Sequence, residues 1–231
     1  MKHILMIAAL AALSACAPPQ SAQVPAPSAA PAAPIKVEAP SGTYTLDKAH
    51  ANLTFHVNHM GFSHYTAQFT KFDATIQLDT ADPAKSSVTA TIDPKSLLLN
   101  TPPKGFTETI TGPQWLAAAQ FPQMTFKSTK VEMTGPDTAK IDGDFTLHGV
   151  TAPVTMEAKF NGGYPGFAMD PHARVGFSAH GVLKRSAFGV ALGIPQPGSS
   201  MGVGDDVDFA VEAEFSGPAW VAPASSAAPA P

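Results

Sequence analysis

Between residues 53 and 215 the chain alternates apolar and polar positions, and this period-two pattern predicts β-strands. In the first stretch Leu53, Phe55, Val57 and His59 share one parity, while polar residues fill the other. Further alternating stretches lie at 65–69, 72–78, 88–92, 124–133, 141–147, 154–160, 175–179 and 207–215. One apolar face per strand is typical of antiparallel sheets that cover a core on one side.

The alternation slips out of phase near Thr70-Lys71 and near Thr129-Lys130, which predicts a bulge or bend at each point. Turn signals such as His148-Gly149 and Gly162-Gly163 separate the strands. Because bulges help a sheet to curl, the pattern predicts an all-β fold, an eight-stranded antiparallel up-and-down barrel that can hold one small ligand. An immunoglobulin-like sandwich is the alternative.

Residues 93–123 break the alternation. Pro113 to Ala119 has proline near its start and Pro122 beyond its end, which predicts a short helix. When 65–69 is counted apart from 72–78, this helix falls in the connection between the fourth and fifth strands. We expect it to cover one end of the barrel with Trp115.

The N-terminal 15 residues have the composition of an exported signal peptide. Lys2 precedes an apolar run that is too short to span a membrane in a mature protein, and small residues lead to Cys16, the only cysteine. The sequence Leu13-Ser14-Ala15-Cys16 resembles a bacterial lipobox, which predicts a lipoprotein-type signal at 1–15 and lipidation of Cys16. An ordinary cleaved signal with an incidental cysteine is the alternative.

The remaining chain divides by composition into a linker, one domain and a tail. Residues 16–41 are rich in Ala and Pro and predict an extended linker after the lipidated Cys16. Residues 42–219 suit a single domain, and 220–231 predict a disordered tail. The domain carries 12 Lys and Arg against 17 Asp and Glu without a basic patch, which argues against nucleic-acid binding.

Three of the eight histidines, His56, His59 and His64, raise the question of a metal or acid–base site. Strand residues three apart point to opposite faces, so His56 and His59 cannot hold one ion. A site with His59 and His64 would need a turn at Gly61 and lacks further ligands at recognised spacing. We therefore expect no metal, no catalytic residue and no enzymatic activity; the inward His59 is an interior histidine or a polar contact for a ligand.

Several motifs then follow one another in a fixed order along residues 42–216. The most specific is GDFTLHGVTAPV at 143–154, and others lie at 44–50, 55–59, 115–122, 185–189 and 203–207. Together they resemble the YceI family of lipocalin-like, polyisoprenoid-binding proteins. The resemblance implies an eight-stranded antiparallel barrel with a helix around an elongated apolar tunnel, in an exported, usually periplasmic protein without established catalytic residues. The chain departs from the family at Thr101 to Glu108, which lacks the motif R-D-x-H-L.

We therefore expect an envelope lipoprotein whose barrel binds, sequesters or carries a polyisoprenoid, an isoprenoid quinone or a fatty acid. This lipid is the expected ligand, with no other cofactor. The expected tunnel residues are Leu53, Phe55, Val57, His59, Phe72, Ile76, Trp115, Met124, Phe126, Phe145, Leu147, Met156, Phe160, Phe177, Phe188, Phe209 and Val211. His59 and Arg185 are candidates for contacting the lipid's head group.

Two other functions stay open at this point: an enzyme or metal/redox protein acting on such a lipid, and a solid-core, stress-related scaffold. The expected partners are the lipid and, through Cys16, a membrane; a homodimer is compatible with the sequence. The expected location is the periplasmic face of the envelope. The outer membrane is favoured because Ala17 stands where an inner-membrane lipoprotein commonly has Asp.

Overall fold

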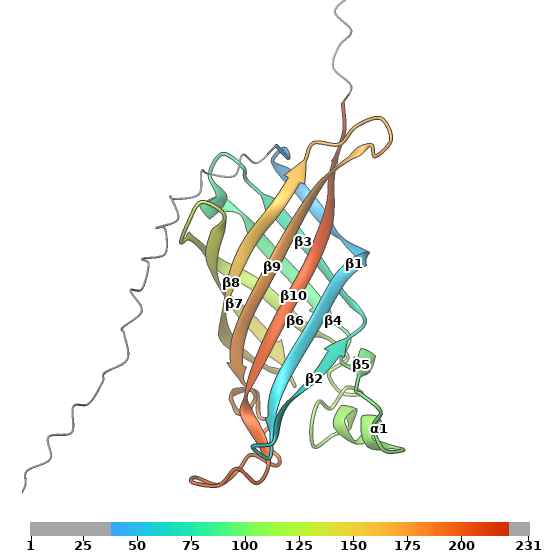
Figure 1. Ribbon diagram of the computed structural model, residues 1–231, viewed down its shortest axis with the longest axis vertical. Coiled ribbons are helices and arrows are strands. Elements are labelled where there is room, and N and C mark those ends of the chain that lie inside the picture. The colour runs from blue at the N-terminus through green and yellow to red at the C-terminus, as the bar shows by residue number, and fades with distance from the viewer. Residues whose placement is uncertain (1–37, 222–231) are drawn as a thin grey trace, which may run out of the picture. The chain divides into compact units, whose positions relative to one another are not determined.

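The computed structural model describes residues 38–221, so Cys16, the predicted signal peptide and most of the linker and tail lie outside the described residues. The described chain is a barrel of antiparallel strands with one short α-helix at one end (Figure 1). Its elements are β1 (Gly42–His59), β2 (Ser63–Phe69), β3 (Phe72–Leu78), β4 (Ser87–Ile92), β5 (Leu97–Leu98), α1 (Phe106–Thr111), β6 (Met124–Met133), β7 (Thr138–Leu147), β8 (Val150–Tyr164), β9 (His172–Lys184) and β10 (Val203–Ala219).

The sheet closes because β10 pairs with both β9 and β1. The order around the barrel is β1, β3, β4, β6, β7, β8, β9 and β10, with every neighbouring pair antiparallel. The second half of β1 pairs instead with β2, and β5 extends the sheet beyond β2. The predicted eight-stranded, lipocalin-like barrel is confirmed, and the alternative of a sandwich is wrong.

Both predicted slips of the alternation occur in the barrel wall. β2 and β3 are two halves of one bent strand, separated at Thr70 and Lys71, and they pair with successive parts of β1. The second slip is a register shift between Ser128 and Lys130 in the pairing of β6 with β7. The prediction of a turn at Gly162-Gly163 is wrong, because both residues lie inside β8 beside another register shift, where Gly162 takes a φ of 145°.

The helix lies earlier than predicted. α1 begins after Gly105, which takes a left-handed conformation, and ends before Gly112, so the prediction of a helix at Pro113 to Ala119 is wrong. The later segment forms turns because Ala117 has a φ of 45° and donates its N–H to the carbonyl of Gly112. No helix among residues 38–221 is long and apolar enough to cross a membrane.

Tyr44 fills the barrel interior near the start of β1 and the end of β10. Its side chain is completely buried, its hydroxyl donates to the carbonyl of Pro40 at 2.7 Å, and burial raises its pKa to about 12. The ring lies directly over Gly217, where a Cβ would come within 2.1 Å of it. The packing therefore requires glycine at this position of β10.

We predict that Gly217→Ala lowers the free energy of unfolding by about 1–3 kcal/mol, because the added methyl group must displace the buried Tyr44 ring. Gly176→Ala is the matched control, since its Cβ would meet no atom closer than 3.8 Å. Urea denaturation of the two variants and the wild type measures the effect. Equal stability of the two variants would contradict this account of Tyr44.

Candidate functional site

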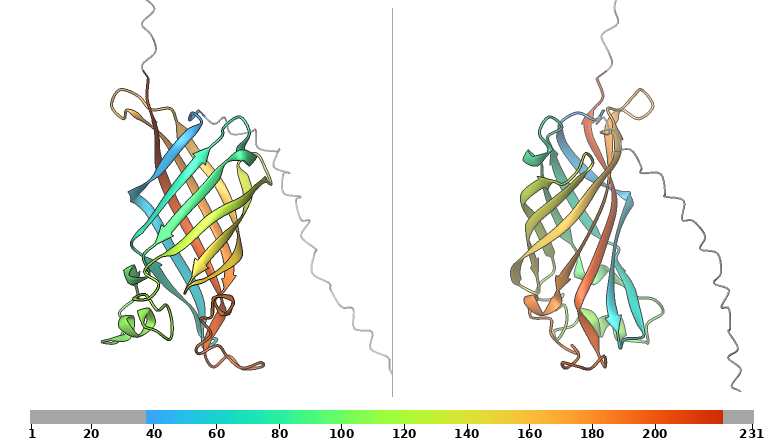
Figure 2. Two further views of the ribbon diagram at one scale, coloured as in Figure 1. Left: turned by 180° about the vertical axis from the view of Figure 1, so that it is seen from behind. Right: turned by 60° about the vertical axis from the view of Figure 1, so that its left-hand side comes forward.

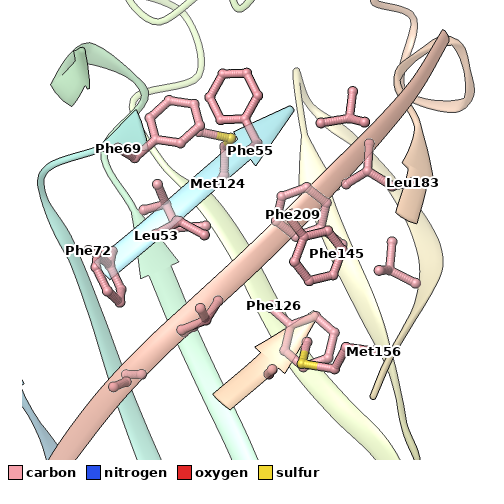
Figure 3. Close-up of a pocket in the computed structure, with 18 of the residues that line it drawn as sticks. Leu53, Phe55, Phe69, Phe72, Met124, Phe126, Phe145, Met156, Leu183 and Phe209 are labelled. Carbon is pink, nitrogen blue, oxygen red and sulfur yellow. The ribbon is translucent and has the colours of Figure 1, made fainter. Parts of the chain in front are cut away.

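An elongated cavity of about 930 Å³ occupies the barrel interior. Inward side chains from strands all around the barrel line it, and its middle is entirely aliphatic, aromatic and thioether (Figure 3). The volume lies at the upper end of the range for small-molecule pockets, roughly 300–1,000 Å³. A barrel of eight strands can also be packed solid. The described interior is hollow, so the alternative of a solid-core scaffold does not fit it.

Small side chains at aligned positions keep the interior hollow. Ala139, Ala158 and Ala179 are register partners across β7, β8 and β9, so they form one row of short side chains on the cavity wall. Ala74 and Ala90 are register partners in the same way across β3 and β4. Larger residues in these rows would reach into the space that the cavity now occupies.

The structure places every expected tunnel residue except Phe188 on the cavity wall. Phe188 lies behind the wall, 1% exposed, with its ring edge-on to Phe145 at 5.5 Å. It belongs to a short 3-10 helix at Arg185–Phe188, where strand parity does not apply. Contact of these residues with a ligand stays a prediction.

The three clustered histidines separate as strand parity predicts. His59 lies on the cavity wall, with its ring 6.5 Å from that of Tyr65, whereas His56 and His64 do not line the cavity. His59 is exposed, so it lies at the rim of the cavity and not deep inside it.

Sequence reasoning missed the part of the wall that follows β4. Leu97 and Leu99 are buried beside β2 and line the cavity. Ile110 of α1 and Leu116, in the turns after α1, line it too. β5 is only two residues long, so no periodic signal could reveal it.

Polar residues line the cavity only toward its two ends. At the end near α1 these include His59, Asn100 and Thr101, and at the other end Thr80 and Asp137. The site can thus accept a long apolar chain along its middle and a polar group at an end.

Arg185 is the charged residue at the α1 end of the cavity, and it is only 5% exposed. Its guanidinium donates four hydrogen bonds to backbone carbonyls and lies 5.3 Å from the ring centroid of Trp115. The four acceptors are Gly204, Val190, Leu192 and Val203, at 2.7–2.9 Å.

The charge of Arg185 has no carboxylate bonded to it among the described residues. Burial lowers the pKa of Arg185, and the nearby charge of Asp205 partly offsets this effect. The Asp205 carboxylate itself accepts hydrogen bonds from Ser186. A guanidinium has five N–H donors, so one N–H on Nη2 remains for another acceptor.

A second polar cluster lies on the outside of the barrel, where extra residues of β1 bulge between Leu46 and Ala51. His50 Nδ1 lies 3.1 Å from Asp47 and 4.0 Å from Glu214. Ligand atoms of these three residues lie within 4.8 Å of one another, a spacing that could hold a metal ion. Arg174, however, already donates to the same Asp47 oxygen at 2.7 Å, and its positive charge disfavours a cation there. That the protein holds no metal stays a prediction.

This cluster predicts a pH dependence of stability. The hydrogen bond that His50 donates to the Asp47 carboxylate, together with the charges of Asp47 and Glu214, raises the pKa of His50 above its ordinary 6.5. Protonated His50 therefore stabilises the fold below about pH 6.5, and this stabilisation is lost as the pH rises through the pKa of the folded state.

We expect the melting temperature of His50→Gln to fall less than that of the wild type as the pH is raised from about 6 to about 8. His64→Gln is the control, because no ion pair involves His64 in the described chain. Identical pH profiles for His50→Gln and the wild type would rule out this contribution.

Arg185→Lys tests whether the guanidinium holds its surroundings together. Lysine keeps the charge but cannot reach all four carbonyls from one position, so we predict a loss of about 3 kcal/mol in the free energy of unfolding. Lys184→Met, which breaks the exposed pair with Asp206, should cost less than about 1 kcal/mol. Urea denaturation compares the two, and similar losses would contradict the structural role of Arg185.

Comparison with known proteins agrees with this architecture. The family model described as the YceI-like domain matches residues 44–215. A UPF0312 protein of Pseudomonas savastanoi is 34% identical over 66% of this chain and 79% of its own length. A UPF0312 protein of Vibrio cholerae is 33% identical over 78% of this chain and 90% of its own.

Solved structures share the barrel. Burkholderia cenocepacia BcnA superposes with a TM-score of 0.61 at 25% identity, covering 73% of this chain and 98% of that one. The Campylobacter jejuni YceI protein gives 0.58 at 28% identity, covering 76% and 98%. A polyisoprenoid binding domain from Saccharophagus degradans gives 0.53 at 15% identity over the same shares, a likeness of fold. From its sequence and its barrel, the chain belongs to the YceI-like family.

Proposed function

We propose that this protein binds one long apolar lipid inside its barrel, and so sequesters or carries it. The observation that carries the proposal is the 930 Å³ cavity with an apolar middle and polar groups at its ends. Each buried CH₂ group of a ligand contributes about 0.8 kcal/mol, so a long chain needs few polar contacts to bind tightly. No catalytic step is part of the proposal.

The lining of the cavity favours an isoprenoid chain or an isoprenoid quinone over a fatty acid. Phenylalanine rings and methionines such as Met124 and Met156 offer adaptable surfaces for a methyl-branched chain. The description of the Saccharophagus degradans domain as polyisoprenoid-binding supports the same ligand class.

The polar end of the lipid, in this proposal, lies toward α1. The free N–H of Arg185 can donate to a carbonyl, hydroxyl or phosphate oxygen, and its positive charge favours an anionic group. His59 at the rim offers a second polar contact. We propose both residues as contacts for the head group of the lipid.

We further propose that the protein works at the periplasmic face of the cell envelope, anchored through lipidated Cys16, with the outer membrane favoured. The lipobox-like sequence before Cys16 and the Ala/Pro-rich linker support this location. Two or more acyl chains would give stable anchoring, whereas one chain holds weakly.

Organic extraction followed by mass spectrometry tests the cavity. We predict that protein purified from its native envelope yields about one long-chain lipid per chain, and that Ala179→Phe reduces the yield at least tenfold. The new ring would lie in the hollow next to Ala158 and occupy the space of several CH₂ groups, each of which contributes about 0.8 kcal/mol to binding.

His180→Phe is the matched control, because it places the same ring one residue further along β9 on the outer face. It should keep the wild-type yield. A wild-type protein that yields no lipid and takes up no added polyprenol would refute the proposed function. Equal lipid yields from Ala179→Phe and His180→Phe would place the ligand elsewhere.

A further inference from the structure

The loops at the α1 end of the barrel carry exposed apolar side chains. Phe62, in the turn between β1 and β2, is 82% exposed, and Met201, before β10, is 67% exposed. Leu192 and Phe106 are 46% and 44% exposed. Figures 1 and 2 show the turn, the loop before β10 and α1 together at this end in every view.

Two of these loops touch each other and border the cavity. The N–H of Met60 donates to the carbonyl of Gly202 at 2.8 Å, which joins the turn at 60–62 to the loop at 189–202. His59 and Val203, which flank the two loops, and Val190, inside the second loop, all line the cavity. The exposed apolar side chains therefore surround an end of the cavity.

The same loops lack charge. Residues 60–63 and 189–202 contain no Asp, Glu, Lys or Arg, whereas the domain as a whole carries 12 Lys and Arg and 17 Asp and Glu. At the opposite end, the turn at 79–86 contains Asp79, Asp82 and Lys85. Transfer of a charged side chain into an apolar phase costs free energy, whereas transfer of an exposed Phe, Leu or Met side chain lowers the free energy.

We propose that these loops, which we call the docking loops (60–63 and 189–202, with Phe106 beside them), insert into the surface of a lipid bilayer. The inference rests on the proposed function, because a bilayer is the phase in which a long apolar lipid resides before it enters the cavity. Contact of the cavity end with the bilayer lets the lipid move between two apolar environments without crossing water.

Labelling at single positions tests which end touches the membrane. Cys16 is the only cysteine, so the full chain with Cys16→Ala takes an environment-sensitive dye only at an introduced cysteine. Phe62→Cys and Met201→Cys report on the docking loops. Met169→Cys is the matched control, because Met169 is 88% exposed and belongs to the connection between β8 and β9, which Figure 1 shows at the opposite end. The probe membrane is a vesicle of phosphatidylethanolamine and phosphatidylglycerol in equal amounts.

Addition of vesicles should lower quenching by a water-soluble quencher several-fold at positions 62 and 201 and leave position 169 unchanged. Equal protection at all three positions, or none at position 62, would overturn the proposal. Protection at position 62 that rises with protein concentration in the absence of vesicles would assign the surface to a second copy, and would overturn it too.

A functional measurement separates docking from lipid binding. The double variant Phe62→Ser/Met201→Ser should transfer a fluorescent polyprenol between vesicles roughly tenfold more slowly, since two apolar anchors are lost. Its binding of the same polyprenol in detergent solution should match the wild type. Unchanged transfer would overturn the docking proposal; a wild type that binds no polyprenol but still protects position 62 would refute the proposed function and leave docking standing.

Discussion

The pairing of β10 with β1 is the constraint on which the rest of this structure depends. It joins the last strand to the first along positions such as Phe55 with Phe209 and Val57 with Val207. Closure gives each strand of the wall a paired strand on both sides, and it turns period-two alternation into a division between inside and outside. Once the sheet is closed, the size of the inward side chains decides whether the interior is solid or hollow.

Strand parity could be predicted from the sequence because it is a local property. The inward positions from Leu53 to His59 follow from alternation alone, and so does the bend at Thr70-Lys71, since a change of phase must be absorbed by the backbone. The hollow interior could not be predicted in this way. It depends on the alignment of Ala139, Ala158 and Ala179 across three strands, and register between strands is set by the whole fold.

Apart from Gly162-Gly163, a glycine pair that lies inside β8, the residues whose placement differs from the prediction lie in 93–123 and 185–202, where neither helical nor strand periodicity applies. Ala117 adopts a left-handed conformation that its own side chain disfavours, so tertiary contacts must hold it. The sequence offers Arg185 as a candidate head-group contact, and in the structure four carbonyls of the surrounding loop accept its hydrogen bonds. A single sequence reveals neither arrangement, because both depend on backbone groups whose positions are set by closure of the barrel.

In the proposed function, the structural role of Arg185 would make it a better contact for a ligand. Its four carbonyl partners hold the guanidinium in one position, so a bound oxygen would meet a donor that loses no side-chain entropy on binding. Burial strengthens such a hydrogen bond, because the surroundings of the charge screen it less than water does. The apolar middle of the cavity discriminates little between chains of equal length, since burial of CH₂ groups is not directional. Selection among lipids would therefore fall on the polar group that reaches Arg185, and the length of the cavity would set only how much chain can follow it.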